Sequence, residues 1–357
     1  MTATFGPSPY IYVCTRLRVR KKKLILREEY MRMLHMGLPE ITRLIQETEY
    51  KREIDELSTS FSGINLLELA LSWNLAKSYQ NVLKILPAGL KEMTSSYLRR
   101  WDIQNVLTIL RGKEQKLKPG RIKEVLIPAG ELDRTFLDRL IAMDSNDEIV
   151  EALKGWRLFR TLESEYQKVP EVGSFAQMEN VLYRQFYAEI IRDAESGIKG
   201  GKEFLDFIQL DIDIRNLQNL LRIRLQGERA EISDYMIPGG SFTVEELSGL
   251  NKIEERGEFY ERLEKSLKNR AFIGFVERLK SSETKAEEER RLEESQVALT
   301  RIQLAQMERM SKMHPFSIWP ILAYLELKKF EIYNLRAITR GKEANLPMER
   351  IRNYLVI

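Results

Sequence analysis

The sequence predicts an all-α protein, and three observations support this fold class. Leu, Met, Glu, Lys, Arg and Gln, which form helices readily, are abundant among the 357 residues. Apolar residues recur at helical spacing, and no run alternates with period two for long enough to suggest a sheet. One helical phrase also occurs three times along the chain, which indicates a protein built from repeated helical domains.

The repeated phrase consists of an acid, an isoleucine, a variable residue, an asparagine and an apolar residue. An arginine follows the asparagine at the same distance in every copy. The copies supply nine signature residues: Asp102, Asn105 and Arg111; Asp213, Asn216 and Arg222; and Glu331, Asn334 and Arg340. A spacing of roughly 110 residues between copies is too long for a solenoid repeat but matches a small domain.

A second phrase, an apolar strip that contains a proline near its end, follows the first two copies. The strips cover residues 121–130 and 231–240, and the chain ends at 350–357 in a segment resembling the start of another. Residues 23–28 are the matching segment before the first copy, although they lack proline and glycine. We therefore predict three helical repeats, each beginning with an extended strip and closing with an asparagine helix: 1–120, 121–229 and 230–357.

Breaks in helical spacing define the helices of the first repeat. We predict helices at residues 29–36, 41–45, 66–85 and 91–111. Gly37 to Pro39 separates the first two of them, and Pro87 with Gly89 ends the third. Gly112, followed by Pro119 and Gly120, is expected to end the fourth, because glycine commonly terminates helices.

The other two repeats show the same arrangement of long helices. In the second, helices are predicted at 178–194 and 204–225, separated by the glycines of 197–201. In the third, a long polar helix at 283–312 is expected to end at His314, because the following proline disfavours helix there. The last predicted helix covers 321–340 and is stopped by Gly341.

The asparagine helix has a buried face. Ile103, Val106 and Leu110 fall on one stripe, which is expected to pack inward. A buried amide without a partner costs roughly 1–3 kcal/mol, so we expect each asparagine to pair with a fixed backbone group. The alternative is an enzyme or ligand site in which the asparagines act with the neighbouring arginines. The structural role is favoured, because a catalytic set is rarely built in triplicate.

Searches for catalytic, cofactor and metal sites give nothing convincing. The only histidines, His35 and His314, have no second histidine or cysteine at ligand spacing, and Cys14 is the single cysteine. No complete phosphate-binding loop is present. The 57 basic and 53 acidic residues are typical of solvated helices, and the stretch 316–325 is too short to span a membrane. We predict no catalytic residue, cofactor or metal.

The strongest basic patch lies near the N-terminus. It contains Arg16, Arg18, Arg20, Lys21, Lys22 and Lys23. Apolar residues alternate with the arginines, which favours a packed element and a contact with a partner protein over a free arm. A helical scaffold that binds nucleic acid or anionic lipid through this patch remains the alternative.

Several segments together resemble one known family. They are residues 12–20 (YVCTRLRVR), 100–105 (RWDIQN), 213–217 (DIRNL), 314–318 (HPFSI) and 331–342 (EIYNLRAITRGK). Along essentially its whole length the chain resembles the C subunit of the archaeal-type (A-type) rotary ATP synthase, a relative of the d subunit of the vacuolar-type ATPase. Cys14 is one departure, since a small hydroxyl residue is expected there.

The resemblance implies a fold and a role. It implies three similar helical domains arranged about a pseudo-threefold axis as a funnel with a central cavity, and no catalytic site. The protein would be a peripheral rotor component on the cytoplasmic face of the cell membrane, with no bound nucleic acid. Its narrow end would contact the membrane proteolipid ring, and its cavity would receive the central shaft, made of the D and F subunits. The coupled ion and the direction of the reaction are not encoded in this chain.

Overall fold

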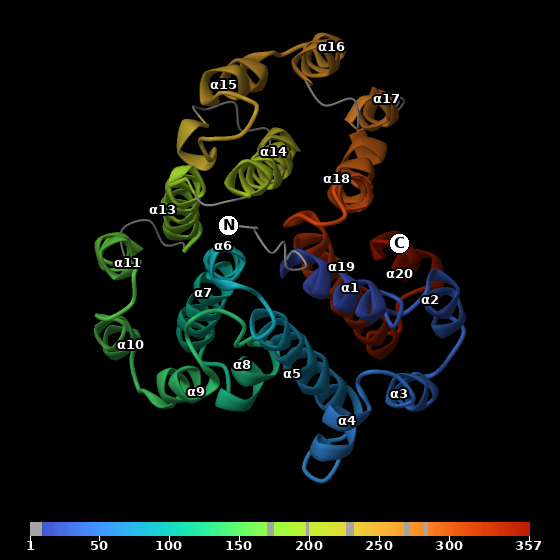
Figure 1. Cartoon of the computed structure of the whole chain (residues 1–357). Helices are drawn as coiled ribbons and strands as arrows, with labels where there is room; N and C mark the ends of the chain where they lie inside the picture. Colours follow the sequence, from blue (N-terminus) through green and yellow to red (C-terminus); the bar gives the residue numbers. More distant parts are fainter. Residues whose placement is uncertain (1–8, 170–174, 198–199, 226–231, 268–271, 281–284) are drawn as a thin grey trace, which may run out of the picture. The chain divides into compact units, whose positions relative to one another are not determined.

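The computed structural model describes residues 9–169, 175–197, 200–225, 232–267, 272–280 and 285–357. Within these ranges the chain folds into helices joined by short loops, and no strand is present (Figure 1). The all-α class predicted from helical spacing is therefore confirmed.

The chain divides into two compact units. The larger unit contains Met1–Gly155, Met310–Leu355 and Ile357, so both ends of the chain contribute to it. The smaller unit contains Trp156–Arg309 and Val356. The division into three repeats and their arrangement as a funnel remain predictions.

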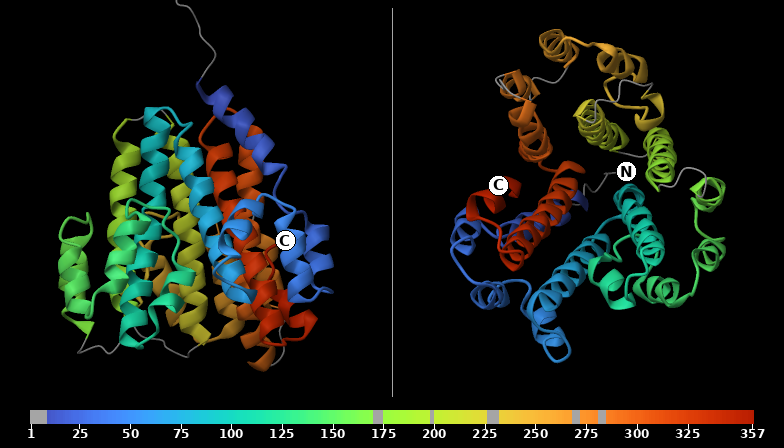
Figure 2. Two further views of the ribbon diagram at one scale, coloured as in Figure 1. Left: turned by 90° about the horizontal axis from the view of Figure 1, so that it is seen from below. Right: turned by 180° about the vertical axis from the view of Figure 1, so that it is seen from behind.

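The larger unit is built around the long helix α5. Its helices are α1 (Pro9–Lys21), α2 (Arg27–Met33), α3 (Leu38–Gln46), α4 (Lys51–Leu57), α5 (Gly63–Leu83), α6 (Ala88–Leu98), α7 (Arg100–Glu114), α8 (Pro119–Val125), α9 (Arg134–Ala142), α10 (Asn146–Ala152), α19 (Trp319–Glu343) and α20 (Met348–Tyr354). Helix α5 packs against α4, α8 and α19, and α1 also packs against α19. Helices from the two ends of the chain, drawn in blue and red, therefore lie side by side (Figure 2).

The smaller unit contains the second group of helices. They are α11 (Phe159–Tyr166), α13 (Ala176–Glu195), α14 (Gly201–Leu225), the short 3-10 helix η1 (Ser233–Tyr235), α15 (Val244–Lys252), α16 (Arg256–Ser266), α17 (Ile273–Lys280) and most of α18 (Lys285–Met313). Helices α13 and α14 pack together, as do α16 and α17. The core includes Leu217, Leu247, Leu263, Val276 and Leu299, all fully buried.

The long predicted helices are present with shifted ends. Those at 66–85, 178–194, 204–225 and 321–340 correspond to α5, α13, α14 and α19, and the helix at 283–312 corresponds to α18, with 283–284 outside the described residues. The single helix predicted at 91–111 is wrong, because α6 and α7 meet at Arg99. The Asp102 amide there donates to the Arg99 carbonyl at 2.9 Å, so the turn tightens between the two helices.

Gly112 and Gly341 do not end their helices, contrary to the prediction. Helices α7 and α19 continue past them and terminate just before Lys116 and Asn345, whose φ angles of 54° and 53° are left-handed. The amide of the residue that follows Lys116 or Asn345 donates to the carbonyl of the glycine at 2.8 Å. This bond closes a Schellman motif in both helices.

The two glycines are needed for close packing instead. A Cβ atom on Gly112 would lie 2.7 Å from Cδ1 of Ile122, and one on Gly341 would lie 2.6 Å from Cγ1 of Ile351. Contacts below 3.0 Å do not occur at real Cβ atoms, so a side chain at either position would displace the isoleucine. The first and third copies of the phrase therefore share a packing contact as well as residues.

The predicted strips are extended only in their second halves. Helix α8 covers the start of the first strip, η1 that of the second, and α20 that of the C-terminal segment. After each of these the backbone becomes extended, at Leu126 (φ −72°, ψ 142°), Met236 (φ −96°, ψ 142°) and Leu355 (φ −74°, ψ 131°). In the N-terminal segment 23–28, which the sequence matched to the strips, residues 23–26 are free of helix and α2 covers the rest.

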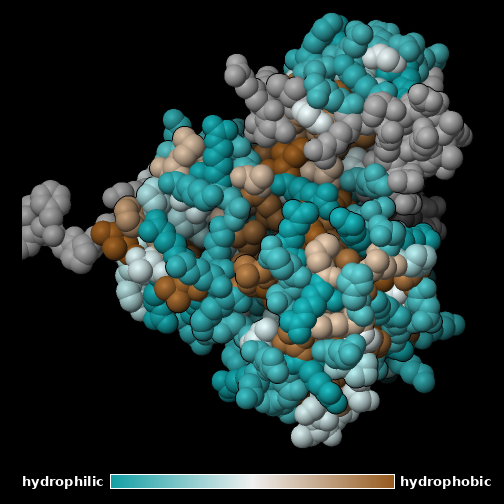
Figure 3. Space-filling view, turned by 90° about the vertical axis from the view of Figure 1, so that its right-hand side faces the viewer, coloured by the Kyte–Doolittle hydropathy of each residue, from teal (hydrophilic) through white to brown (hydrophobic). Residues whose placement is uncertain are grey.

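Charged side chains cover much of the surface. On the face drawn in Figure 3, hydrophilic side chains predominate, and apolar ones form smaller groups between them. This distribution agrees with the many charges of both signs in the sequence. Within the described part of the chain, no helix is long and apolar enough to cross a membrane.

Candidate functional site

Helix α7 holds the first strip through two signature residues. Nδ2 of Asn105 donates to the Ile127 carbonyl at 2.7 Å, and the Ile127 amide donates to Oδ1 at 2.9 Å. One turn earlier, the Asp102 carboxyl accepts the amides of Glu131 at 2.8 Å and Leu132 at 3.0 Å. The asparagine thus pairs with a fixed backbone group, as expected for a buried amide.

Helix α14 repeats this arrangement in the smaller unit. Nδ2 of Asn216 donates to the Ile237 carbonyl, and the Ile237 amide donates back to Oδ1, both at 2.8 Å. The Asp213 carboxyl accepts the amide of Ser241 at 2.8 Å and its hydroxyl at 2.5 Å. The two copies therefore fasten equivalent strips in the same way, although they lie in different units.

Glycine completes both of these contacts. A Cβ atom on Gly130 would lie 2.2 Å from Oδ1 of Asp102, and one on Gly240 would lie 2.3 Å from Oδ1 of Asp213. Only glycine allows the backbone to come this close to the carboxyl group. The close contact with the acid of the phrase thus explains why each strip has a glycine two residues after its proline.

Helix α19 binds a different segment with the third acid. Oε2 of Glu331 accepts the amide of Ile25 at 2.6 Å, and Oε1 accepts the Tyr50 hydroxyl at 2.5 Å and Nζ of Lys328 at 2.7 Å. Asn334 is buried and forms a hydrogen bond with Tyr30. The third acid therefore holds the N-terminal segment that the sequence matched to the strips.

Burial changes the acid–base properties of these groups. Burial raises the pKa of the Asp102 carboxyl from 3.8 to about 7, although the hydrogen bonds from two backbone amides lower this pKa. Burial also raises the pKa of Tyr50 well above its usual value, and the adjacent Glu331 carboxylate adds to the effect. The Asp102 carboxyl and the Tyr50 hydroxyl are thus both buried and hydrogen-bonded.

The three signature arginines do not share one role. Arg111 is half-buried on α7, whereas Arg222 is exposed and donates to Oδ1 of Asn219 at 3.0 Å. Arg340 donates from Nε to Oε1 of Glu68 at 2.6 Å. Since the asparagines and acids are bonded to backbone or to neighbouring side chains, the structure gives no support to a ligand set built from the phrase.

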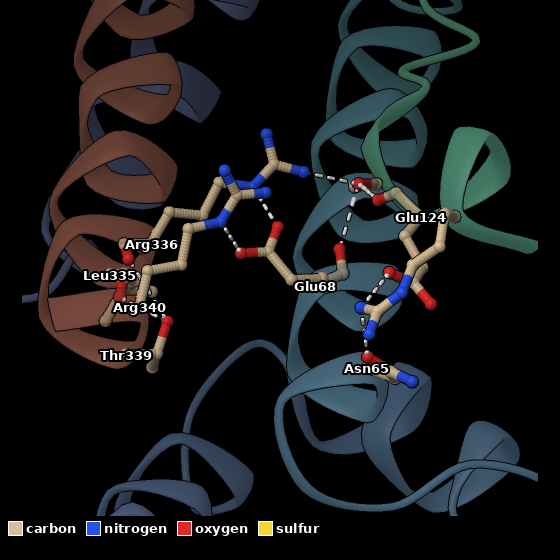
Figure 4. A network of polar contacts seen from close by, with 9 residues as sticks. Asn65, Glu68, Glu124, Leu335, Arg336, Thr339 and Arg340 are labelled. Carbon is tan, nitrogen blue, oxygen red and sulfur yellow. Dashed lines mark hydrogen bonds and ion pairs between the residues drawn. The ribbon is translucent and has the colours of Figure 1, made fainter. Parts of the chain in front are cut away.

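A buried polar network that the sequence reasoning missed joins α5 to α19 (Figure 4). The Glu68 side chain is only 4% exposed and lies 2.7 Å from Nε of Arg336 and 2.6 Å from Nε of Arg340. Arg336 also donates to Oγ of Ser72 at 2.6 Å. Glu68 is a lone acid within the apolar run 66–71, which was the available signal.

The predicted basic patch lies on α1 and in the turn that follows it. Arg16, Arg18, Lys22 and Lys23 are exposed, and Arg20 and Lys21 are half-buried. Three of these side chains have different local partners. Arg16 contacts Tyr12, Arg18 donates to the Pro315 carbonyl at 3.5 Å, and Lys23 pairs with Glu49 at 2.8 Å.

Metal ions such as zinc require several ligand side chains held close together. No group of three or more histidine, cysteine, aspartate or glutamate side chains within the described residues could hold a metal ion. His35 and His314 are both exposed. Cys14 is buried, and burial raises the pKa of its thiol to about 11, so the thiolate is scarcely populated at neutral pH.

Comparisons with known proteins place this chain among the subunits of one family. A family described as "ATP synthase (C/AC39) subunit" matches residues 13–354. The chain is 37% identical to the C subunit of the A-type ATP synthase from Methanosarcina mazei, over 99% of this chain and 94% of the relative. It is 36% identical to that of Methanococcoides burtonii, over 98% and 95%, and 33% identical to that of Haloferax volcanii, over 100% of both chains.

Proposed function

The chain belongs to the family of ATP synthase C/AC39 subunits, and from this premise we propose that it is a rotor subunit of an A-type ATP synthase. It has no catalytic role and acts as a socket that joins the central shaft to the membrane proteolipid ring. Torque passes through it between ion flow in the ring and ATP synthesis or hydrolysis elsewhere in the complex. It sits peripherally on the cytoplasmic face of the membrane.

The family match over nearly the whole chain carries this proposal. The geometry of the signature residues supports a load-bearing role, because their polar atoms fasten loops to long helices. A part that transmits torque must be stiff, and close-packed helices with fixed connections provide stiffness. The funnel of three repeats implied by the family would supply the cavity for the D and F subunits of the shaft.

The exposed face of α1 is the proposed contact with a partner. It combines apolar side chains (Ile11, Tyr12 and Val19) with Arg16 and Arg18. Aromatic and arginine side chains are enriched where proteins bind each other, and exposed apolar residues beside them provide buried area on binding. This face therefore suits a stable contact with another protein of the complex.

A binding assay tests the proposal. The purified chain is expected to bind the isolated D and F subunits and the detergent-solubilised ring over a range of salt concentrations. Substitution of Tyr12 and Val19 by serine should weaken one of these complexes, whereas serine at the exposed Leu117 should have no effect. Failure of the wild-type chain to bind either partner at any salt concentration would refute the proposal.

One observation favours a second candidate, binding of anionic lipid or nucleic acid. Helix α1 contains no acidic residue, and its last turn carries Arg18, Arg20 and Lys21. Binding of this kind would weaken steeply as salt rises and would disappear when the six basic residues of the patch are neutralised. Binding to D, F or the ring that persists at high salt would distinguish the rotor role.

A further inference from the structure

A polar cavity lies inside the larger unit, apart from the signature residues. It has a volume of about 270 Å³ and lies between α1, α4, α5 and α19. Its lining includes five basic side chains, contributed by Arg20, Lys23, Arg52, Lys77 and Lys328, and two acids, Glu49 and Glu53. The excess of basic groups makes the cavity electropositive.

The lysines of the cavity already have partners. Lys23 pairs with Glu49, and Lys77 with the buried Glu53 at 2.7 Å. Lys328 bonds to the Tyr50 hydroxyl and to Glu331. These ion pairs fix the walls and neutralise both acids of the lining.

The two arginines are different. Among the residues that the structure describes, neither Arg20 nor Arg52 forms an ion pair with a carboxylate. Guanidinium groups are planar donors that bind phosphate oxygens in pairs, more specifically than an ammonium does. Two uncompensated guanidinium groups over a cavity form the donor set that a phosphate group requires.

Asn74 belongs to the wall of the cavity. Its Nδ2 atom donates to the Glu49 carbonyl at 2.9 Å and to Glu53 at 2.8 Å, and this fixes the amide. Because Glu53 also pairs with Lys77, the amide and the ion pair hold the same part of the wall in place.

We propose that this cavity binds a phosphate group through Arg20 and Arg52. The ligand is either free inorganic phosphate or a small phosphate ester, or the headgroup of an anionic phospholipid. Both sources present the same charged oxygens. The inference does not depend on the proposed rotor role, because the cavity lies within one unit of the chain.

Thermal unfolding in inorganic phosphate, compared with chloride at constant ionic strength, tests this site. Phosphate should raise the melting temperature of the full chain in a saturable manner. In the Arg20→Gln/Arg52→Gln variant the apparent Kd should rise by about tenfold or more, because two charged hydrogen-bond donors are lost. The single variant Arg52→Gln, at an exposed position, provides the same test if the double variant is unstable.

The control is Arg43→Gln, which removes an exposed arginine of the same unit that lies outside the cavity and should leave binding unchanged. Sedimentation with phosphatidylglycerol vesicles identifies the source of the phosphate. Vesicle binding that free phosphate competes away assigns a lipid headgroup, and phosphate binding without vesicle binding assigns the free anion. No saturable phosphate effect, or equal effects in the cavity and control variants, would overturn the proposal.

Discussion

At the scale of single residues, a carboxyl group and an amide one turn apart position a loop against a helix. The asparagine bonds both the amide and the carbonyl of one buried residue, Ile127 or Ile237. The acid binds the turn that follows. The two side chains bind different parts of the same loop, which explains why they recur together in the sequence.

Replacing Asn105 by alanine should destabilise the larger unit by about 1–3 kcal/mol, because it removes two hydrogen bonds and leaves the Ile127 amide unpaired. Denaturant unfolding measures this change. Gln104→Ala, at an exposed position in the same phrase, is the control and should change stability by less than about 0.5 kcal/mol. Equal effects of the two substitutions would contradict the assigned role of Asn105.

Gly130→Ala tests the close approach to the acid. The new methyl group would overlap the Asp102 carboxyl at 2.2 Å, so the turn must move and lose the hydrogen bonds to Glu131 and Leu132. We expect a loss of about 2 kcal/mol or more in thermal unfolding. Gly120→Ala, where a Cβ atom meets nothing within 4 Å, should be neutral or slightly stabilising. A neutral Gly130→Ala would show that the contact is not required.

Asp102 predicts a pH dependence of stability. Its pKa is about 7 in the folded chain and near 3.8 when exposed, so between these values the folded state binds a proton that the unfolded state does not. The free energy of unfolding should therefore fall as pH rises through this interval and level off above it. The stability difference between wild type and Asp102→Asn isolates this contribution. It should change between about pH 4 and pH 8, and a constant difference would contradict the assignment.

At the scale of helices, the contact of α5 with α19 combines apolar packing with the Glu68 network. Glu68 and Arg336 are largely buried, whereas the Arg340 side chain is 53% exposed. Burial lowers the pKa of the Arg336 guanidinium, and the Glu68 carboxylate opposes that shift, so each charge depends on the other. The pair fixes the register of two helices that lie far apart in the sequence.

A double-mutant cycle of Glu68→Gln with Arg336→Met should give a coupling energy of about 1–3 kcal/mol. The matched cycle of Glu68→Gln with Arg340→Gln should give about 0–1 kcal/mol, because solvent screens an exposed partner. Urea unfolding at neutral pH provides both values. Similar coupling energies in the two cycles would mean that burial does not strengthen the Arg336 pair.

The sequence predicted the long helices and two short ones, α2 and α3, and missed other short helices. Sustained helical spacing located α5, α13, α14, α18 and α19, because a long buried stripe leaves a clear pattern. Helices α8 and α20 were assigned to extended strips, because a helix of seven residues makes only about two turns and shows little periodicity. The stops assigned to Gly112 and Gly341 failed because glycine there serves packing with an isoleucine of a later segment, a contact invisible in local sequence.

The same limit applies to the candidate site. Asparagines paired with a backbone group were predictable, because a buried amide needs a partner whatever the fold. The identity of that partner, and the network around Glu68 and Arg336, required the packing of segments more than 260 residues apart. The different roles of the three arginines likewise depend on which helix lies beside each of them.

At the scale of the molecule, one phrase recurs in both compact units. Its first two copies hold strips that follow them, whereas Glu331 in the third copy holds Ile25 near the other end of the chain. The larger unit is thus closed by contacts between its N-terminal and C-terminal segments. A unit tied in this way resists opening at its ends, as the proposed rotor role would require.

Coupling between ATP hydrolysis and ion movement tests the central claim most directly. A-type ATP synthase complexes are assembled in vesicles with and without this chain, and both activities are measured in each. The rotor role predicts that complexes without the chain hydrolyse ATP but move no ions, and that adding the purified chain restores ion movement. Full ion movement driven by ATP in complexes that lack the chain would contradict the claim.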